Sequence, residues 1–182
     1  MRKALLIIDV QNDYFPNGKC ELCQSEEALE AIKRLLKYFR ENSQPVWYVQ
    51  HISEENAAFL IPNTDGASIH REIKPLDSNK VIEKHYPNSF YETDLQKELK
   101  RNSVTELVVC GMMTHMCVDT TVRAAQDLGY QVTLISDACA TKSLEWKGNK
   151  ISADIVQSVY MTSIHGEFAD VMTVNEFLSE VS

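Results

Sequence analysis

The sequence contains no apolar run long enough to cross a lipid bilayer. The run near its beginning, residues 4–8, holds five apolar residues before Asp9, whereas a spanning helix needs about 20. No small-residue cleavage site follows this run, so it does not have the form of a signal peptide. We therefore interpret it as a strand and expect a cytoplasmic protein.

Positive charge is also in short supply. The chain has 18 Lys and Arg against 26 Asp and Glu, which gives a formal net charge of −8. A negatively charged protein repels phosphate backbones and anionic lipid head groups. This balance counts against nucleic acid or a membrane as the partner and favours a small-molecule substrate.

The glycine-rich motifs that cradle nucleotide phosphates are missing, since neither G-x-G-x-x-G nor G-x-x-x-x-G-K-S/T occurs. Five cysteines are present, an odd number that argues for free thiols over a disulfide framework. Cys20 and Cys23 form a C-x-x-C pair, which would suit a thiol redox module or half a zinc site. Because a second pair is missing and no helix is expected to begin there, we favour neither role.

The length of 182 residues, with 44% hydrophobic and 24% charged residues, predicts a single globular domain over residues 1–182. Short apolar runs alternate with stretches of helical period, which is typical of strands and helices in βα order. The predicted strands span residues 4–10, 45–50, 81–83, 107–110, 132–136 and 169–172, and the predicted helices span 25–42, 93–101, 114–128, 151–165 and 173–181. This order predicts an α/β fold, a three-layer α/β/α sandwich with a mostly parallel, six-stranded, Rossmann-like sheet.

Polar residues at the expected helix starts predict how the helices are capped. Ser25, Thr114 and Thr173 are expected N-caps, and Thr93 with Gln96 has the spacing of a capping box. Residues 51–80 show no clear period, which favours a lid or binding loop, with a short helix near residues 57–60 as an alternative.

Three residues able to do chemistry follow apolar runs. Asp9, Lys84 and Cys117 are all expected near the carboxyl ends of parallel strands, where ligands bind in such sheets. Cys117 falls in the first turn of a predicted helix, where the helix dipole and a nearby ammonium would lower its pKa. Asp9, partly desolvated, could then act as a base. Taken singly, each residue is better explained without catalysis: Cys117 as a small buried hydrophobe, Lys84 as a surface charge and Asp9 as a strand-end cap.

Three ordered blocks of sequence carry a resemblance to a known family. They are residues 6–15, which read LIIDVQNDYF, Lys84 with Asn88-Ser89-Phe90, and residues 109–118, which read VCGMMTHMCV. The chain resembles the isochorismatase-like cysteine hydrolases, which include nicotinamidases and related amidases. The resemblance implies a catalytic triad of Asp9, Lys84 and Cys117, a cis peptide bond at Met112-Met113, and an oxyanion hole formed by the backbone amides of Met113 and Cys117.

The function implied by this resemblance is cysteine-dependent hydrolysis of a small-molecule amide, a C–N bond, through an acyl-thioenzyme intermediate that needs no cofactor. Two alternatives remain open. One is an isochorismatase-type vinyl ether hydrolase, although a retained Cys117 favours acyl chemistry. The other is a non-catalytic binding module on the same fold, since fold alone does not fix function.

The residues around the expected site suggest a substrate pocket without a metal. Nicotinamidases of this family carry an Asp-x-His metal motif after the second strand, where this chain has Gln50-His51-Ile52-Ser53. His51 and His70 alone would make a poor metal site, so none is predicted. Candidates for contact with a flat or apolar acyl group are Tyr14, Phe15, Phe59, His115 and Trp146. The resemblance also leads us to expect a homo-oligomer.

Overall fold

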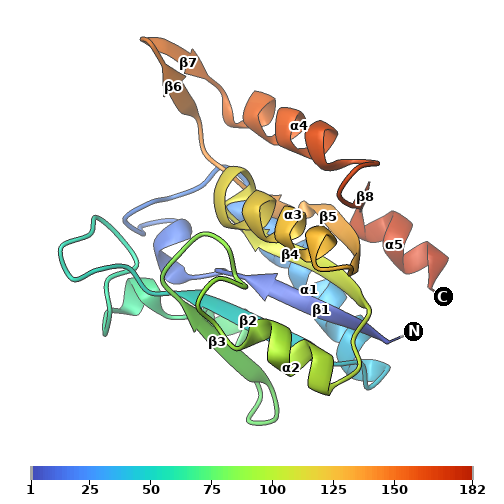
Figure 1. Cartoon of the computed structure of the whole chain (residues 1–182). Helices are drawn as coiled ribbons and strands as arrows, with labels where there is room; N and C mark the ends of the chain where they lie inside the picture. Colours follow the sequence, from blue (N-terminus) through green and yellow to red (C-terminus); the bar gives the residue numbers. More distant parts are fainter. Residues whose placement is uncertain (1, 182) are drawn as a thin grey trace.

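A computed structural model describes residues 2–181, and its centre is a six-stranded sheet whose neighbouring strands all run parallel (Figure 1). In spatial order the strands are β3 (Lys80–Lys84), β2 (Val46–His51), β1 (Lys3–Ile8), β4 (Glu106–Met112), β5 (Gln131–Ala140) and β8 (Asp170–Met172). The predicted fold class is confirmed. No helix within residues 2–181 combines the length and the apolar character that a membrane span requires.

Helices cover both faces of this sheet. Side chains of β1 alternate between the two cores: Leu5 and Ile7 face one layer, while Leu6 and Ile8 face the other. The first layer consists of α1 (Ser25–Glu41) and α5 (Val174–Glu180), and the second of α2 (Leu95–Arg101), α3 (Asp119–Asp127) and α4 (Ala153–Ile164). Burial on both faces explains why the central strands read as continuous apolar runs.

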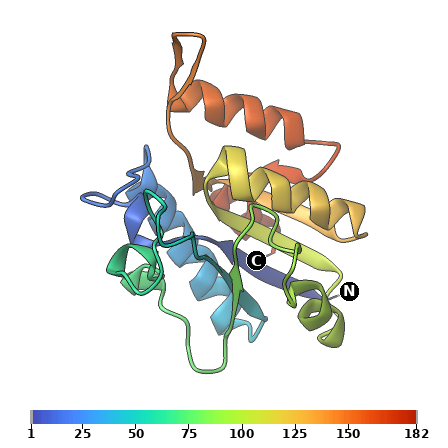
Figure 2. The ribbon, with the colours of Figure 1, turned by 60° about the vertical axis from the view of Figure 1, so that its left-hand side comes forward.

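A small antiparallel hairpin was not predicted. It consists of β6 (Leu144–Trp146) and β7 (Asn149–Ile151), joined by Lys147 and Gly148. Both joining residues have positive φ, 50° and 81°, as two-residue hairpin turns require. In Figures 1 and 2 the hairpin projects beyond α4, away from the sheet. Its strands are too short to show the alternation of polar and apolar residues on which the sequence analysis relied.

Strand β5 is longer than predicted because it continues past Asp137 to Ala140. Its pairing with β4 shifts register between Val109 and Gly111. Gly111 has a φ of +131°, and a Cβ atom there would collide with the backbone of Ile8 on β1. Only glycine allows this close approach of β1 and β4. The approach lies at the carboxyl ends of the two strands, one residue before Asp9.

The predicted helix caps were mostly wrong. Ser25 is the first residue of α1 instead of its N-cap, and the preceding Gln24 is left-handed. Thr93 and Gln96 form no capping box; the Thr93 hydroxyl donates to the carbonyl of Ser89 at 2.6 Å instead. The Thr93 hydroxyl bonds to a local partner that the sequence spacing does not reveal.

The two remaining predicted caps had opposite outcomes. Thr114 lies inside a π-helical turn, η4 (Thr114–Val118), that precedes α3, and the N-cap position falls on Met113. Thr173 is confirmed, because it forms a capping box with Glu176 at the start of α5.

Residues 52–79 form an ordered loop with two 3₁₀ turns, η2 (Asp65–Ala67) and η3 (Arg71–Ile73), and the alternative helix near residues 57–60 is absent. A third turn, η1 (Asn12–Tyr14), follows β1. The buried Asp13 ties the two regions together, because its carboxylate accepts the backbone N–H of Leu60 at 2.7 Å and of Lys19 at 3.1 Å. The long loop is therefore fixed against the carboxyl end of β1.

Candidate active site

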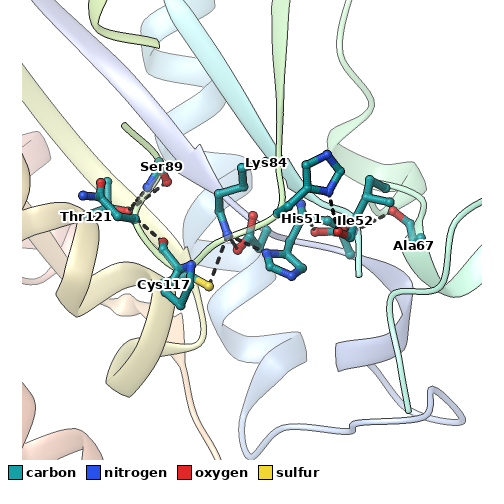
Figure 3. A network of polar contacts seen from close by, with 12 residues as sticks. His51, Ile52, Ala67, Lys84, Ser89, Cys117 and Thr121 are labelled. Carbon is teal, nitrogen blue, oxygen red and sulfur yellow. Dashed lines mark hydrogen bonds and ion pairs between the residues drawn. The ribbon is translucent and has the colours of Figure 1, made fainter. Parts of the chain in front are cut away.

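Four adjacent strands each deliver one side chain to the same place. In the order β3, β2, β1 and β4, these side chains are Lys84, His51, Asp9 and Cys117, the last from the turn η4 beyond β4 (Figure 3). The Lys84 Nζ atom lies 2.7 Å from Asp9 Oδ2 and 3.3 Å from Cys117 Sγ. Asp9, Lys84 and Cys117 are 0%, 1% and 6% exposed. The structure therefore brings the three sequence-predicted residues into contact.

Asp9 sits in an uncommon backbone conformation. Its φ is +50°, in the left-handed region, which costs a non-glycine residue on the order of 1 kcal/mol or more. Its backbone N–H donates to the carbonyl of Val49 at 3.0 Å, so β2 holds this conformation in place. Such residues concentrate at functional sites because the surrounding structure must enforce them.

Cys117 is positioned by the turn η4 and by hydrogen bonds between the loop that follows β3 and the helix α3. The Met112–Met113 peptide bond that precedes the turn is cis. The Ser89 N–H donates to Thr121 Oγ1 at 3.0 Å, and the two hydroxyls are 2.8 Å apart. This contact fixes the loop after Lys84 against α3, the helix that follows the turn carrying Cys117 (Figure 3). The oxyanion hole of Met113 and Cys117 amides stays a prediction.

Burial is the largest single influence on the pKa of Asp9 and of Lys84, but it decides the direction of the shift only for Asp9. It raises the pKa of Asp9 above its ordinary value, and the charge and hydrogen bond of Lys84 oppose this shift. For Lys84, burial lowers the pKa, but attraction by Asp9 and Cys117 outweighs it, so its pKa is raised. The ammonium therefore keeps its proton at neutral pH, while the carboxyl is disposed to take one up.

The predicted low pKa of Cys117 was wrong. Burial raises the pKa of this thiol well above its ordinary value, the charge of Asp9 raises it further, and Lys84 only partly offsets the two. At neutral pH the side chain is therefore a thiol. A thiolate nucleophile can form here only as its proton passes to a base, and Asp9 is in position to receive it.

The sequence analysis missed His51 as a member of this cluster. Its Nδ1 atom lies 3.0 Å from Lys84 Nζ. Burial, with help from the charges of Lys84 and His85, lowers the pKa of His51 to about 4. The ring is therefore neutral at physiological pH, and Nδ1 accepts from the ammonium. The available signal was its position at the end of a buried strand, like Asp9, but it was considered only as a metal ligand.

Gln11 was also missed. Its side chain is buried and bonds to both backbone atoms of His51: Nε2 donates to the carbonyl at 2.8 Å, and Oε1 accepts the N–H at 2.9 Å. The same Nε2 donates to the carbonyl of Ala67 at 2.7 Å. Gln11 therefore joins the end of β2 to the long loop.

Metal ligation must be judged from the same cluster. Single ligand atoms of Asp9, His51 and Cys117 lie within 4.8 Å of one another. The Lys84 ammonium is within 3.3 Å of each of these side chains, so it supplies positive charge where a cation would bind. His70 has other partners: its Nδ1 accepts the N–H of Glu72 at 3.4 Å.

Of the predicted pocket residues, Tyr14 and Phe59 fit the site best. Tyr14 is buried, and burial, with smaller contributions from the charges of Asp9 and Cys117, raises its pKa. The ring of Phe59 lies 5.9 Å from that of Tyr14. The pair connects the turn η1 after β1 with the long loop of residues 52–79.

The other three residues are engaged elsewhere. The ring of Phe15 is tilted against that of His70, with the ring centroids 4.3 Å apart, and Phe15 packs in the core. Half-buried His115 has its Nδ1 2.6 Å from the Thr141 hydroxyl. Trp146 is 69% exposed on the projecting hairpin and is not part of the cluster (Figure 1). The prediction that Trp146 contacts the substrate did not take this hairpin into account.

Comparison with known proteins agrees with this geometry. The family model for the isochorismatase domain matches residues 3–175. The chain belongs to the isochorismatase-like hydrolase family. The isochorismatase family protein YddQ of Bacillus subtilis is 48% identical over 98% of this chain and 99% of its own. A crystal structure of an isochorismatase-family protein from Oleispira antarctica superposes with a TM-score of 0.95 at 40% identity, covering 98% and 96% of the two chains.

More distant members of the isochorismatase-like family have named activities. Streptothricin hydrolase of Streptomyces noursei is 34% identical over 76% of this chain and 50% of its own length. Nicotinamidase 3 of Arabidopsis thaliana is 28% identical over 76% of this chain and 73% of its own. The family is thus hydrolytic, and it includes amidases.

Proposed function

We propose that this protein is a cysteine-dependent hydrolase that cleaves an amide C–N bond in a small molecule. The observation that carries the proposal is one buried ammonium in contact with both a carboxylate and a thiol, at 2.7 Å and 3.3 Å. A thiol next to a base is the arrangement that nucleophilic catalysis requires. A vinyl ether hydrolase has no evident need for this thiol.

In the acylation half-reaction, Asp9 accepts the thiol proton as Cys117 Sγ bonds to the amide carbon. The carbonyl becomes a tetrahedral oxyanion, which the backbone amides of Met113 and Cys117 stabilise in our proposal. When the C–N bond breaks, Asp9 returns its proton to the leaving nitrogen. Ammonia or an amine departs, and the acyl group remains on Cys117 as a thioester.

In the second half-reaction, Asp9 removes a proton from water, which attacks the thioester carbon. The C–S bond breaks, the thiol recovers its proton from Asp9, and a carboxylic acid leaves. Lys84 stays protonated throughout and offsets the negative charge that moves between Asp9, Cys117 and the substrate oxygen. No cofactor enters this scheme.

The named relatives support amide chemistry over the alternatives. Two of them are a streptothricin hydrolase and a nicotinamidase. A non-catalytic binding module would have no use for a buried aspartate in a left-handed conformation next to a buried thiol. Tyr14 and Phe59 suit a flat or apolar acyl group, which is the substrate class that we propose.

The test is the release of ammonia or amine from a panel of small carboxamides, comparing the wild type with Cys117→Ala and with Cys23→Ala. Cys23 is exposed, so its variant controls for general effects of removing a thiol. We expect loss of turnover in Cys117→Ala alone and an acyl adduct on Cys117 in quenched wild-type samples by mass spectrometry. Equal activity of Cys117→Ala and the wild type would refute the assignment.

Including a vinyl ether in the same panel distinguishes the first alternative, since its cleavage releases neither ammonia nor amine. A binding module would raise its melting temperature with ligands but turn over none of them.

A further inference from the structure

The Lys84 ammonium has three N–H donors and three acceptors around it. These are Asp9 Oδ2 at 2.7 Å, His51 Nδ1 at 3.0 Å and Cys117 Sγ at 3.3 Å. The Lys84 side chain has no accessible surface, so water does not satisfy a donor that loses its partner. His51 therefore completes the coordination of a buried cation.

We propose that His51 is a positioning residue of the active site, which accepts a hydrogen bond from Lys84 and thereby holds the ammonium charged and directed at Asp9 and Cys117. The inference rests on the proposed function, because the orientation of Lys84 matters for the hydrolysis described above. His51 does not touch the reacting atoms itself in this scheme.

The backbone around His51 supports such a role. His51 pairs with Lys84 in the register between β2 and β3, so the two residues are neighbours on adjacent parallel strands. Gln11 fixes the backbone of His51 from the opposite side. The imidazole therefore leaves a rigid strand end with its Nδ1 atom already at the ammonium.

The charges that face His51 keep it an acceptor. Lys84 and, on the solvent side, His85 disfavour a second proton on the ring, as does burial, whereas Asp9 is engaged with Lys84. With Nδ1 accepting, the single ring proton is on Nε2. A buried ammonium that loses such an acceptor gives up its proton more readily, because burial favours the uncharged amine.

Two variants distinguish the effect of the Nδ1 acceptor of His51 from the effect of the bulk of its side chain. In His51→Asn, the amide oxygen replaces Nδ1 at about the same distance from Cα, and in His51→Leu the acceptor is lost with similar bulk. The Gln11 bonds involve only the backbone of residue 51, so both variants keep them. Circular dichroism and thermal unfolding establish that each is folded.

We expect His51→Asn to keep kcat within about threefold of the wild type, and His51→Leu to lose about tenfold to a hundredfold in kcat with little change in KM. In His51→Leu alone, the alkaline limb of the kcat profile should move to lower pH, since Lys84 deprotonates earlier. Identical kcat values and alkaline limbs in the two variants would overturn the proposal.

A second measurement does not depend on turnover. In protein labelled with ¹⁵N-histidine, His51 should appear as a neutral ring protonated on Nε2 between pH 5 and pH 8, identified by the signal missing in His51→Asn. Lys84→Met should raise the pKa of His51, because it removes the neighbouring positive charge.

The two measurements keep the hypotheses apart. A His51 ring protonated on Nδ1, or a pKa unmoved in Lys84→Met, would disprove the contact whatever the enzyme hydrolyses. If the spectra agree but no carboxamide is turned over, the contact between His51 and Lys84 stands and the proposed amidase function fails.

Discussion

At the scale of single residues, the site depends on the Lys84 ammonium, which contacts three side chains. They are those of Asp9, His51 and Cys117. Asp9 and Cys117 are both disfavoured as anions by burial, and Lys84 is the charge that opposes this for each of them. The charge of Lys84 therefore lowers the cost of moving the proton from the thiol to the carboxyl. This is the condition under which a group serves as base in one step and acid in the next.

Alkylation of Cys117 should be slow in the free enzyme. The thiol is protonated at neutral pH and only 6% exposed, whereas Cys23 is exposed. With iodoacetamide at pH 7, peptide mass spectrometry should therefore find Cys23 modified before Cys117. Preferential modification of Cys117 would mean that the thiolate forms without substrate, contrary to the electrostatics of the site.

The pH dependence of kcat/KM should report Asp9 and show no ordinary histidine. Activity requires ionised Asp9, so it should rise with pH through a limb that lies above the usual aspartate pKa of about 3.9. Because the pKa of His51 is lowered to about 4, no limb near pH 6.5 should come from this ring. His51→Asn is the control: its acidic limb should match the wild type, and its disappearance would assign the limb to His51.

At the scale of elements, the geometry of the site depends on how closely β1 and β4 approach. Gly111 has no room for a Cβ atom against the backbone of Ile8, one residue before Asp9. Any change that separates these strands moves the base away from the nucleophile.

Gly111→Ala should destabilise the protein by about 2–4 kcal/mol, because it adds both a backbone clash and strain at positive φ. Gly148→Ala is a matched control, since Gly148 also has positive φ but an added Cβ atom meets nothing within 4 Å. It should cost about 1 kcal/mol. Urea unfolding measures both, and equal losses would show that the clash is relieved by small movements.

Sequence reasoning succeeded for elements with strong apolar patterns and failed where local partners decide. The buried strands and the residues at their ends were predicted because burial on two faces leaves an unmistakable run. The caps at Ser25 and Thr93, the hairpin around Gly148 and the pKa of Cys117 were not. Each of these depends on a tertiary neighbour or on the depth of burial, which the linear sequence does not contain.

His51 illustrates the same limit within the site. Its position after a buried strand is visible in the sequence, but its role depends on facing Lys84, a residue 33 positions later. Only the parallel order of β3 beside β2 brings the two together.

At the scale of the whole molecule, the projecting hairpin and α4 present apolar side chains to solvent. Trp146 on β6 and both Ile155 and Val159 on α4 are exposed. A two-stranded hairpin is barely stable alone in water, and neighbouring exposed apolar residues are typical of interaction surfaces. This surface is a reasonable site for a second copy of the chain.

We predict a homo-oligomer in solution that Trp146→Ser combined with Ile155→Ser weakens. The control is Leu128→Ser, which changes an exposed apolar residue at the end of α3. Light scattering over a dilution series should show a lower mass for the double variant alone. A wild type that is monomeric at every concentration would contradict the prediction.

Lys84 is carried by β3, an edge strand of the sheet, which pairs with β2 on one side only. Peripheral strands open before central ones when a protein is warmed. In the proposed mechanism the positive charge is therefore held by an edge strand, while the proposed base and nucleophile follow the central strands β1 and β4. Local opening of β3 would separate Lys84 from Asp9 and Cys117, so activity would be lost at a lower temperature than the one at which the whole protein unfolds. A ligand that holds β3 in place would protect activity more than overall stability.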